Sequence, residues 1–232
     1  MVKSRGLREA KRKIGDLEKI IFQMLRRKKK VRVFESGCGY WRVMVELKKR
    51  FGDRIDIVGM NLKPSHGDKK KMISFALKEG IINKNEVKDI KSIKIVFGDA
   101  GNRLPFKTGS IDLVYSQVSS YLYKDKMHFL EEVARVLSKE GIARITPFTY
   151  ARGLPKELLP LLKIYDNGKC MSFERFIKKF KNIKIKKIPS KNEVIEVKKG
   201  KLNFGLRLES SINVNNLNKE WFGIQSIYSV KK

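Results

Sequence analysis

A glycine-containing turn between a short apolar run and a helical pattern is the first place where this sequence could do chemistry. The turn reads Glu35-Ser-Gly-Cys-Gly39 and follows the β-branched run that begins at Val31. Glycine lets a backbone pass close beneath a bound molecule, and the amides at the start of the next helix would face a carboxylate or a phosphate. Two glycines also suit any sharp connection, so a ligand site and a tight loop are both open interpretations.

The elements around this turn predict an α/β fold. Short β-branched runs at 31–35, 55–60, 93–97, 110–115 and 141–146 alternate with helical patterns at 41–51, 69–79 and 124–138. Strands that alternate with helices form parallel βαβ units with right-handed crossovers. We therefore expect a three-layer αβα sandwich with a mostly parallel sheet, whose ligands bind at the carboxyl ends of the strands.

The two ends of the chain differ from this central part. Apolar residues at spacings of three and four predict one basic amphipathic helix over 7–30. After residue 147 the alternation stops, and a helix at 172–180 and short strands are expected. These strands, at 183–188, 194–197, 202–208 and 224–230, would be antiparallel and complete the sheet edge or form a small cap. We divide the chain into an N-terminal helix at 1–30, a core at 31–148 and a basic C-terminal part at 149–232.

Four features of the core occur together in the order of a known family. They are the acidic-x-Gly-x-Gly turn at 35–39, the strand end Val58-Gly-Met-Asn-Leu62, the segment Phe97-Gly-Asp-Ala100, and the strand at 110–117 with its helix at 129–137. Each is common alone, but the four at these intervals resemble the class I S-adenosylmethionine-dependent methyltransferases, within their type-11-like group. The resemblance covers roughly residues 31–148 and implies a Rossmann-like core with S-adenosylmethionine as cofactor.

The resemblance also implies which residues bind the cofactor. Glu35 would hold its amino group, Asn61 its ribose hydroxyls, and Asp99 the adenine amino group, with a backbone donor from Ala100. These residue types suit a zwitterionic tail, two hydroxyls and a base. The cofactor-binding set is Glu35, Gly37, Cys38, Gly39, Asn61, Leu62, Asp99, Ala100, Ser116 and Gln117. No residue is assigned as a catalytic base.

Two positions depart from the family pattern. Asn61 stands where the family most often has Asp or Glu, so its hydrogen bond to ribose would be neutral and weaker. Trp41 replaces the third glycine of the first motif, and we expect it to pack beneath the turn. Asp99 could instead be a turn or N-cap residue, and Asp112 is expected to make a local structural hydrogen bond.

The segment after the fourth strand restricts the acceptor. It reads Tyr115-Ser-Gln-Val-Ser-Ser120 and contains neither the Asn/Asp-Pro-Pro-aromatic box nor the Pro-Cys pair of the family's base-modifying enzymes. Adenine N6 and cytosine C5 are therefore disfavoured as acceptors, and hydroxyls, ring nitrogens and small molecules are left. Gln117, Tyr121 and Tyr123 are expected near the reacting group, whereas His128 falls within the next helix as a structural residue.

Charge is concentrated in the flanks of the chain. The formal net charge is +29, and residues 1–30 hold 12 basic against 3 acidic residues. Residues 151–232 hold 19 basic and 7 acidic residues, so the flanks carry most of the excess. Such a charge favours a nucleic-acid partner, RNA above all, held through phosphate contacts. A compositional bias towards lysine is the alternative explanation.

The few cysteine and histidine residues and the hydropathy of the chain exclude other classes of protein. Cys38 and Cys170 cannot build a disulfide framework or a four-ligand zinc site, and His66 and His128 lie near neither, so no metal is expected. No apolar run approaches 18 residues, and the N-terminal segment does not resemble a signal peptide. We expect a reducing, cytoplasmic location without a membrane partner, and the oligomeric state stays open.

Three functions remain in competition. The first is a methyltransferase that acts on RNA through its basic flanks. The second is the same core acting on a small molecule or a protein, with the helix at 7–30 as a lid. The third is a non-catalytic methyltransferase-like binding module. A dinucleotide-dependent oxidoreductase fits worse, because its G-x-G-x-x-G motif needs glycine at the position of Arg42.

Overall fold

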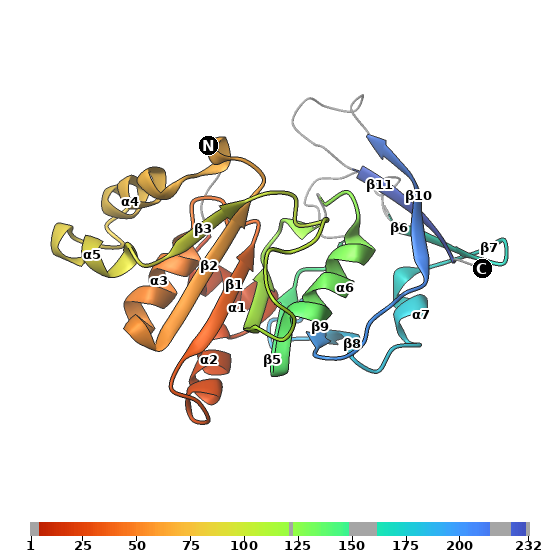
Figure 1. Cartoon of the computed structure of the whole chain (residues 1–232), viewed down its shortest axis with the longest axis horizontal. Coiled ribbons are helices and arrows are strands. Elements are labelled where there is room, and N and C mark those ends of the chain that lie inside the picture. The colour runs from red at the N-terminus through yellow and green to blue at the C-terminus, as the bar shows by residue number, and fades with distance from the viewer. Residues whose placement is uncertain (1–4, 121–122, 149–161, 214–223, 231–232) are drawn as a thin grey trace.

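Five adjacent parallel strands make up most of a seven-stranded sheet in the computed structural model, which describes residues 5–120, 123–148, 162–213 and 224–230 (Figure 1). The strands are β1 (Val31–Ser36), β2 (Ile55–Asn61), β3 (Lys94–Phe97), β4 (Ile111–Ser116) and β5 (Leu137–Ile145). The sheet order is β3-β2-β1-β4-β5-β9-β8, in which β9 (Glu193–Lys198) runs antiparallel to both β5 and β8 (Ile183–Lys187). The strand order reverses between β1 and β4, and a crevice for a ligand opens at such a point.

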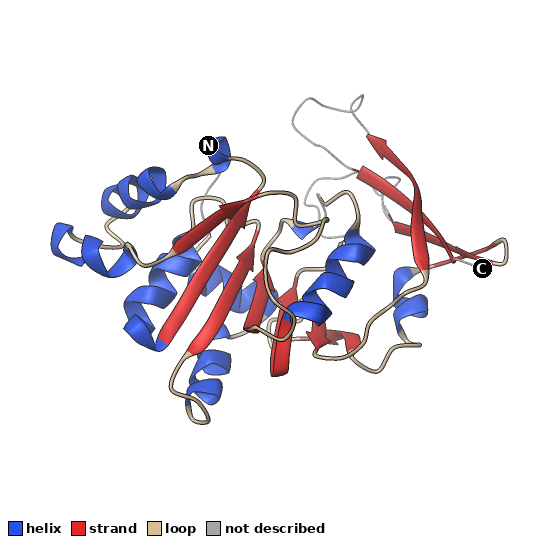
Figure 2. Ribbon diagram, viewed as in Figure 1, coloured by secondary structure: helices blue, strands red, loops and turns tan. Residues whose placement is uncertain are grey.

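Helices cover both faces of this sheet (Figure 2). One buried cluster joins the sheet to α1 (Leu7–Ile14), α2 (Leu17–Leu25), α3 (Arg42–Phe51), α4 (Lys69–Lys78) and α5 (Val87–Ile90). A second cluster on the opposite face contains α6 (Lys126–Val136) and α7 (Phe173–Ile177). Short 3-10 turns are η1 (Gly52–Arg54), η2 (Pro64–His66) and η3 (Lys84–Glu86). The predicted Rossmann-like three-layer αβα sandwich, with antiparallel strands towards the C-terminus, is confirmed.

A separate four-stranded sheet contains the rest of the described C-terminal part. Its order is β10-β11-β6-β7, formed by β6 (Leu162–Asp166), β7 (Lys169–Met171), β10 (Leu206–Asn213) and β11 (Ile224–Val230). The predicted strands at 183–188 and 194–197 thus extend the main sheet. The strand predicted at 202–208 begins only at Leu206, and it belongs with the strand at 224–230 to the second sheet. The strands β6 and β7 were not predicted, because runs this short lack a visible apolar alternation.

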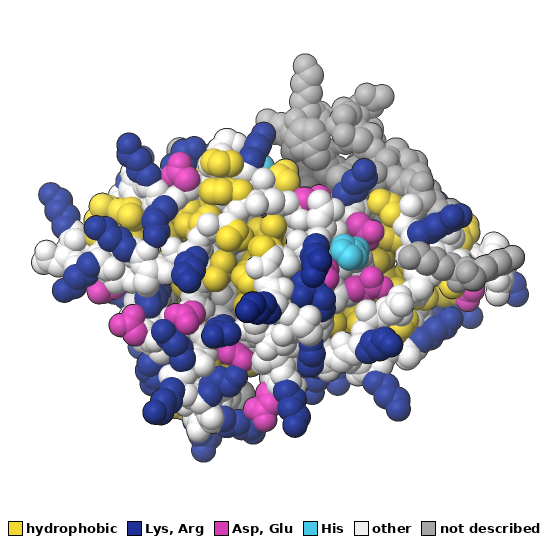
Figure 3. Space-filling view, in the orientation of Figure 1, with side chains coloured by type: hydrophobic (Ala, Val, Ile, Leu, Met, Phe, Trp, Pro, Cys, Tyr) yellow, Lys and Arg dark blue, Asp and Glu magenta, His cyan; other side chains and the backbone are white. Residues whose placement is uncertain are grey.

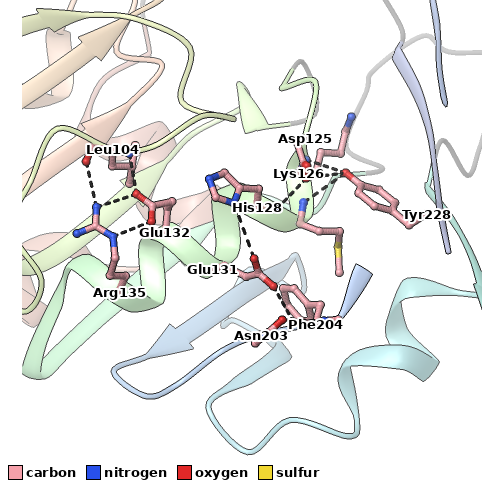
Figure 4. Close-up of polar contacts among 12 residues, drawn as sticks. Leu104, Asp125, Lys126, His128, Glu131, Glu132, Arg135, Asn203, Phe204 and Tyr228 are labelled. Atoms are coloured by element: carbon pink, nitrogen blue, oxygen red, sulfur yellow. Dashed lines mark hydrogen bonds and ion pairs between the residues drawn. The ribbon is translucent and has the colours of Figure 1, made fainter. Parts of the chain in front are cut away.

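The second sheet is attached to α6 by buried polar contacts (Figure 4). The hydroxyl of Tyr228, from β11, accepts from the backbone amide of Lys126 at 2.8 Å and lies 3.2 Å from Oδ1 of Asp125. The amide of Phe204 donates to Glu131 at 2.6 Å. Tyr228 therefore supplies a partner to an amide in the first turn of α6, where the helix itself offers none.

A loop takes the place of a helix between β3 and β4. The carboxylate of Glu132, on α6, accepts from the amide of Leu104 at 2.8 Å (Figure 4). The guanidinium of Arg135 donates to the carbonyls of Leu104 and Phe106 at 3.0 and 2.9 Å. These contacts fix the loop against the sheet face that α6 leaves uncovered, and Phe97 at the end of β3 remains 43% exposed.

The prediction of a single helix over 7–30 is wrong. Gly15 has φ +94° and ψ 178°, a conformation that glycine adopts far more readily than other residues. Asp16 then caps α2 by accepting from the amide of Lys19 at 2.9 Å. The apolar stripe continues through Ile14 and Leu17, both buried, so its periodicity conceals the break.

Smaller differences concern the ends of elements. The fifth strand begins at Leu137, four residues before the predicted start, and the helix predicted at 172–180 covers only Phe173–Ile177. Among the described residues, no helix is both long and apolar enough to cross a bilayer, and no group of three or more metal-ligating side chains occurs.

Candidate active site

A cavity of about 630 Å³ opens at the carboxyl ends of the parallel strands, beside the reversal between β1 and β4. We call it the switch-point cavity. All of the predicted cofactor-binding residues except Ser116 line it: Glu35, Gly37, Cys38, Gly39, Asn61, Leu62, Asp99, Ala100 and Gln117. The structure therefore brings together residues that come from the ends of four different strands.

The glycine turn is held tightly against β2. Gly37 has φ +72°, and a Cβ atom built there would lie 2.3 Å from the side chain of Ser119. The amides of Gly37 and Cys38 both donate to the carbonyl of Met60, at 2.9 and 3.1 Å, and that of Gly39 donates to Asn61. The hydrogen atoms of these three amides are therefore used within the protein, and the expectation that amides at the start of α3 face an anion stays a prediction.

Trp41 packs beneath the turn, as predicted. Its side chain is fully buried, its φ is +63°, and its amide donates to the carbonyl of Cys38 at 2.8 Å. A non-glycine residue in this left-handed region is uncommon, so the packing of the indole holds a conformation that other residues would avoid. The bulk that replaces the family's third glycine thus points away from the cavity and into the core below it.

The side chain of Asn61 joins two loops at the rim of the switch-point cavity. Its Oδ1 accepts from the amide of Gly39 at 2.9 Å, and its Nδ2 donates to the carbonyls of Gly39 and Gly67 at 3.1 and 3.2 Å. An aspartate could make the first of these bonds but not the other two, because a carboxylate has no donor. The structure gives a physical reason for an amide at this position, and the role of Asn61 in binding ribose stays a prediction.

Glu35 provides a buried carboxyl group at the end of β1. It is 5% exposed and lines the cavity, and its Oε2 accepts from the hydroxyl of Tyr115 at 2.9 Å. Burial raises the pKa of Glu35 to about 8, although the hydrogen bond from Tyr115 opposes the shift. No ion pair to this carboxyl occurs among the residues that the structure describes. A ligand with an ammonium group would supply the missing positive charge.

Asp99 and Ala100 lie together on the cavity wall after β3. Oδ1 of Asp99 accepts from the amide of Gly101 at 2.8 Å, so Asp99 does make the turn contact considered for it from the sequence. That bond uses one carboxylate oxygen, and a carboxylate has a second one. The turn contact and a ligand contact are therefore compatible.

Asp112 has the structural role that the sequence predicts. Its carboxylate accepts from Nζ of Lys28 at 2.6 Å, from the amide of Arg32 at 2.8 Å and from the hydroxyl of Ser138 at 2.7 Å. These donors hold the pKa of Asp112 below its usual value, against the effect of burial. Asp112 thereby fixes the start of β1 to β4 and does not line the switch-point cavity.

The end of β4 contributes one unsatisfied donor to the cavity. Gln117 is 8% exposed, and its Nε2 has no hydrogen-bond partner among the described residues. A buried donor of this kind costs free energy unless a ligand or a water molecule accepts from it. Ser116 is fully buried and contacts the hydroxyl of Ser119 at 2.7 Å, so it supports the loop from below. Tyr121 lies outside the described residues.

A family model described as a methyltransferase domain matches residues 34–145, the segment that carries the glycine turn, Glu35 and Asp99. By this match, residues 34–145 are similar to a methyltransferase domain. The match ends with β5, so the strands β6 to β11 and the helices α1 and α2 lie outside the methyltransferase domain. A search of the curated proteins finds no match.

Several solved structures with similar folds are described as methyltransferases, and another is described as a [4+2]-cyclase. A protein of Methanococcus maripaludis, assigned as an S-adenosylmethionine-dependent methyltransferase, is 22% identical over 79% of this chain and 85% of its own, with a TM-score of 0.47. An arsenic(III) methyltransferase of Chlamydomonas reinhardtii is 23% identical over 50% of this chain and 38% of its own, with a TM-score of 0.41. A protein of Bacillus halodurans, also assigned as a methyltransferase, is 22% identical over 56% of this chain, with a TM-score of 0.40. This chain spans about half of the Bacillus protein, 49% of its length.

Several residues that line the methyltransferase domain's cavity had not been singled out from the sequence. Arg5 reaches it from the N-terminal segment, and Ser65 and His66 reach it from η2. The turn Pro64-Ser-His-Gly67 after the second strand was the available signal, because proline followed by glycine marks a sharp turn. Nothing in the sequence indicates Arg5, since its position depends on how α1 packs against α3.

The residues present fit the methyl donor. The buried carboxyl of Glu35 suits the ammonium group of the cofactor, and the carboxylate of Asp99 suits its adenine amino group. Nε2 of Gln117, which has no partner among the described residues, suits a hydrogen-bond acceptor of the cofactor. A cavity of about 630 Å³ is also in the range that cofactor-sized ligands occupy. The assignment of each residue to a part of the cofactor stays a prediction.

Proposed function

We propose that this protein transfers a methyl group from S-adenosylmethionine to RNA. The observation that carries the methyl-donor part is the carboxyl group of Glu35, which is buried, lacks a cationic partner among the described residues and faces the switch-point cavity. Strongly shifted pKa values in a cleft are typical of functional sites. A cation is the ligand chemistry that would restore the charge of this carboxyl.

The chemistry needs alignment more than it needs an acid or a base. When bound, the sulfonium cofactor supplies an already activated methyl group, so the protein's task is to orient the acceptor in line and to exclude water. Gln117, Ser119 and Tyr123 lie on the cavity wall at the end of β4, where an acceptor would approach. The hydroxyl of Tyr123 is engaged with Ser36 at 2.5 Å, so we propose that this tyrosine shapes the wall and takes no proton.

The RNA part of the proposal rests on charge. The flanks of the methyltransferase domain hold most of the net charge of +29, and single-stranded RNA is bound through such cations. The described segment from Ser116 to Ser120 offers no proline-containing box for gripping a base. This favours a ribose hydroxyl or a ring nitrogen as the acceptor.

A small-molecule acceptor is the second candidate, and one observation favours it. Arg5 lines the cavity, and the amide of Leu7 is anchored to the carboxylate of Glu46 on α3. Glu46 also accepts from Nε of Arg42 at 2.9 Å, and Arg42 itself lines the cavity. The segment before α1 therefore borders the entrance in the way that a lid over a small substrate would.

Cofactor binding is tested by calorimetry with S-adenosylmethionine on the wild type and on Asp99→Ala. Removal of a charged hydrogen-bond acceptor is expected to weaken binding about 10- to 100-fold. Asp89→Ala is the matched control, because Asp89 is an exposed aspartate on α5 and does not line the cavity. Wild-type protein that fails to bind at millimolar cofactor would overturn the methyltransferase proposal, whereas equal binding by both variants would overturn only the adenine site.

The acceptor class is tested with a methyl-labelled cofactor and a cell extract divided into RNA, protein and low-molecular-mass fractions. We expect label in the RNA fraction that ribonuclease releases and protease does not. Label confined to the low-molecular-mass fraction would support the second candidate and contradict RNA as the substrate.

A further inference from the structure

A second cavity lies between α2, β5 and β9 and shares no lining residue with the switch-point cavity. It has a volume of about 910 Å³ and is bordered by the end of α2, the start of β5 and the end of β9. We call it the α2–β5–β9 cleft. Its lining contains six cationic side chains and one carboxylate: Arg26, Arg27, Lys139, Arg144, Lys198, Lys199 and Glu140. In Figure 3, Lys and Arg side chains are spread over the whole visible face, including the lower edge, where Figure 1 places α2 and the start of β5.

We propose that the α2–β5–β9 cleft binds the phosphate backbone of single-stranded RNA. The proposal deepens the proposed RNA substrate and rests on it, because it says where the protein holds that substrate away from the reacting group. The cleft runs along β5 from Lys139 to Arg144 and shares no lining residue with the cavity predicted to hold the cofactor. Its contribution is therefore to affinity and not to the methyl-transfer step.

The single carboxylate of the cleft does not neutralise its cations. Glu140 lies 3.5 Å from Arg27, and their side chains are 61% and 73% exposed. An exposed pair at this distance contributes little, because solvent and salt screen it. The excess positive charge in a concave surface concentrates the field, which attracts an extended polyanion.

The floor of the cleft contains a guanidinium that is fixed in place. Arg144 is 16% exposed, and its terminal nitrogen lies 2.8 Å from the carboxylate of Glu196, which is 1% exposed. Nε of Arg144 is buried and has no hydrogen-bond partner among the described residues. A guanidinium that an ion pair already holds in place would bind a phosphate at little cost in side-chain entropy.

The ammonium group of Lys199 is already engaged within the protein. Its Nζ donates to the carbonyl of Arg135, at the end of α6, at 2.6 Å. Lys199 therefore borders the cleft as a cation that is held in place.

The shape of the cleft and its apolar side chains favour a nucleic-acid strand over a flat polyanionic surface. Ile20, Met24 and Ile142 lie among the cations. A lipid bilayer needs an exposed basic face and cannot enter a concave site. A single strand presents phosphates together with ribose and base surfaces, which match alternating cationic and apolar side chains.

The test is fluorescence anisotropy with a labelled oligouridylate over a range of salt concentrations. The cleft variant is Lys139→Gln with Lys198→Gln, because both lysines are exposed and neither supports a buried carboxylate. The matched control is Lys88→Gln with Lys91→Gln, which removes two exposed charges at the α5 end of the molecule. The two proteins have equal net charge, so only the position of the replaced lysines differs.

We expect the cleft variant to bind oligouridylate about tenfold more weakly near 0.1 M salt, with a salt slope that is shallower by about 0.7 for every phosphate it no longer binds. The control is expected to stay within about twofold of the wild type. Equal weakening of the two variants would mean that bulk charge binds RNA and would overturn the proposal, as would wild-type affinity in the cleft variant. Polyglutamate that binds as tightly as RNA, with the same dependence on Lys139 and Lys198, would assign the cleft to an acidic protein segment instead.

Calorimetry with S-adenosylmethionine on the same proteins separates this proposal from the proposed function. Unchanged cofactor binding by the cleft variant shows that its fold is intact. If the wild type binds RNA through the cleft but fails to bind the cofactor, methyl transfer is contradicted and the cleft is not. If it binds the cofactor but the cleft variant keeps full RNA affinity, the cleft is contradicted and methyl transfer is not.

Discussion

At the scale of single residues, the switch-point cavity combines one group kept neutral by burial with one side chain used to hold the loops. Glu35 is surrounded by protein and accepts one hydrogen bond, from Tyr115. Asn61 uses its amide to bind the carbonyls of two loops. The first group can respond to a charged ligand, whereas the second keeps the cavity in shape, and the two roles predict different mutant behaviour.

Glu35→Gln is expected to change how stability depends on pH. The pKa of Glu35 is about 8 in the folded protein and 4.5 in an unfolded chain, so the folded state binds the proton more tightly between these values. Stability therefore falls as pH rises from about 5 to 8, by up to about 5 kcal/mol and in practice less after relaxation. Glutamine stays neutral and keeps an acceptor for Tyr115, so the variant should not show this loss.

The measurement is urea unfolding at pH 5, 7 and 9 for the wild type, Glu35→Gln and Glu79→Gln. Glu79 is exposed after α4 and serves as the control. Curves of stability against pH that run parallel for the wild type and Glu35→Gln would show that the carboxyl is not held neutral.

Asn61→Asp is expected to lower the stability of the fold, although the family most often has an acidic residue at this position. The carboxylate would face the carbonyls of Gly39 and Gly67 without a donor, which costs roughly 1–3 kcal/mol. The affinity for the cofactor should fall together with the stability, because the side-chain amide of Asn61 also holds the glycine turn. Urea unfolding and calorimetry with S-adenosylmethionine measure the two effects.

Asn83→Asp is the matched control for this substitution. The side-chain oxygen of Asn83 accepts from the amides of Asn85 and Glu86, and aspartate caps a helical turn as well as asparagine does. Tighter cofactor binding by Asn61→Asp at unchanged stability would contradict the loop-holding role and would favour a direct contact with ribose.

At the scale of elements, the periodic segments were predictable and their connections were not. The five parallel strands follow from β-branched runs, and α6 follows from an apolar period that buries its side chains at spacings of three and four. The break at Gly15 was hidden, because an apolar stripe can continue across two helices that pack on the same surface. The sequence does not predict that the C-terminal strands form a separate sheet. The order of that sheet depends on pairing between β6 and β11, which are far apart in the sequence.

The same limit applies to the candidate site. Glu35, Gly37 and Asp99 stand in recognisable motifs, so sequence reasoning could place them on one cavity. The contacts that occupy Asn61 depend on a turn at Gly67, whose Cβ would lie 2.6 Å from the carbonyl of Gly39. Such a contact exists only after folding and leaves no mark in the spacing of residues.

Tyr228→Phe is expected to loosen the junction between α6 and the second sheet. The hydroxyl accepts from the amides of Lys126 and Met127 at 2.8 and 3.3 Å, and its removal leaves these buried donors short of a partner. The expected loss of stability is about 1–3 kcal/mol. Hydrogen exchange should accelerate in the first turn of α6 before it does so in the parallel strands.

Tyr165→Phe on β6 is the control for this junction. Tyr165 is half-buried in the same sheet, and its hydroxyl does not bind to α6 among the described residues. Uniform acceleration of exchange over the whole chain, or equal effects of the two substitutions, would contradict a local role for Tyr228.

At the scale of the whole molecule, the charge of +29 opposes folding as well as attracting a polyanion. Most ion pairs of the described residues involve an exposed partner, so they offset this repulsion only in part. The repulsion is expected to be strong at the α2–β5–β9 cleft, whose lining holds six cations, of which Arg27 and Arg144 have a carboxylate partner. Repulsion of this kind is screened over a Debye length of about 10 Å at 0.1 M salt.

The melting temperature is therefore expected to rise with sodium chloride, by roughly 2–8 °C between low and moderate salt if screening recovers about 1–2 kcal/mol. Scanning calorimetry on the wild type, Lys139→Gln/Lys198→Gln and Lys88→Gln/Lys91→Gln separates local from general repulsion, because both variants lose the same charge. If the repulsion is strongest at the cleft, Lys139→Gln/Lys198→Gln gains more stability at low salt than Lys88→Gln/Lys91→Gln does. Its melting temperature then also depends less on added salt. A melting temperature that falls with salt would show that surface ion pairs outweigh self-repulsion, and equal gains by the two variants would show that the charge acts on the molecule as a whole.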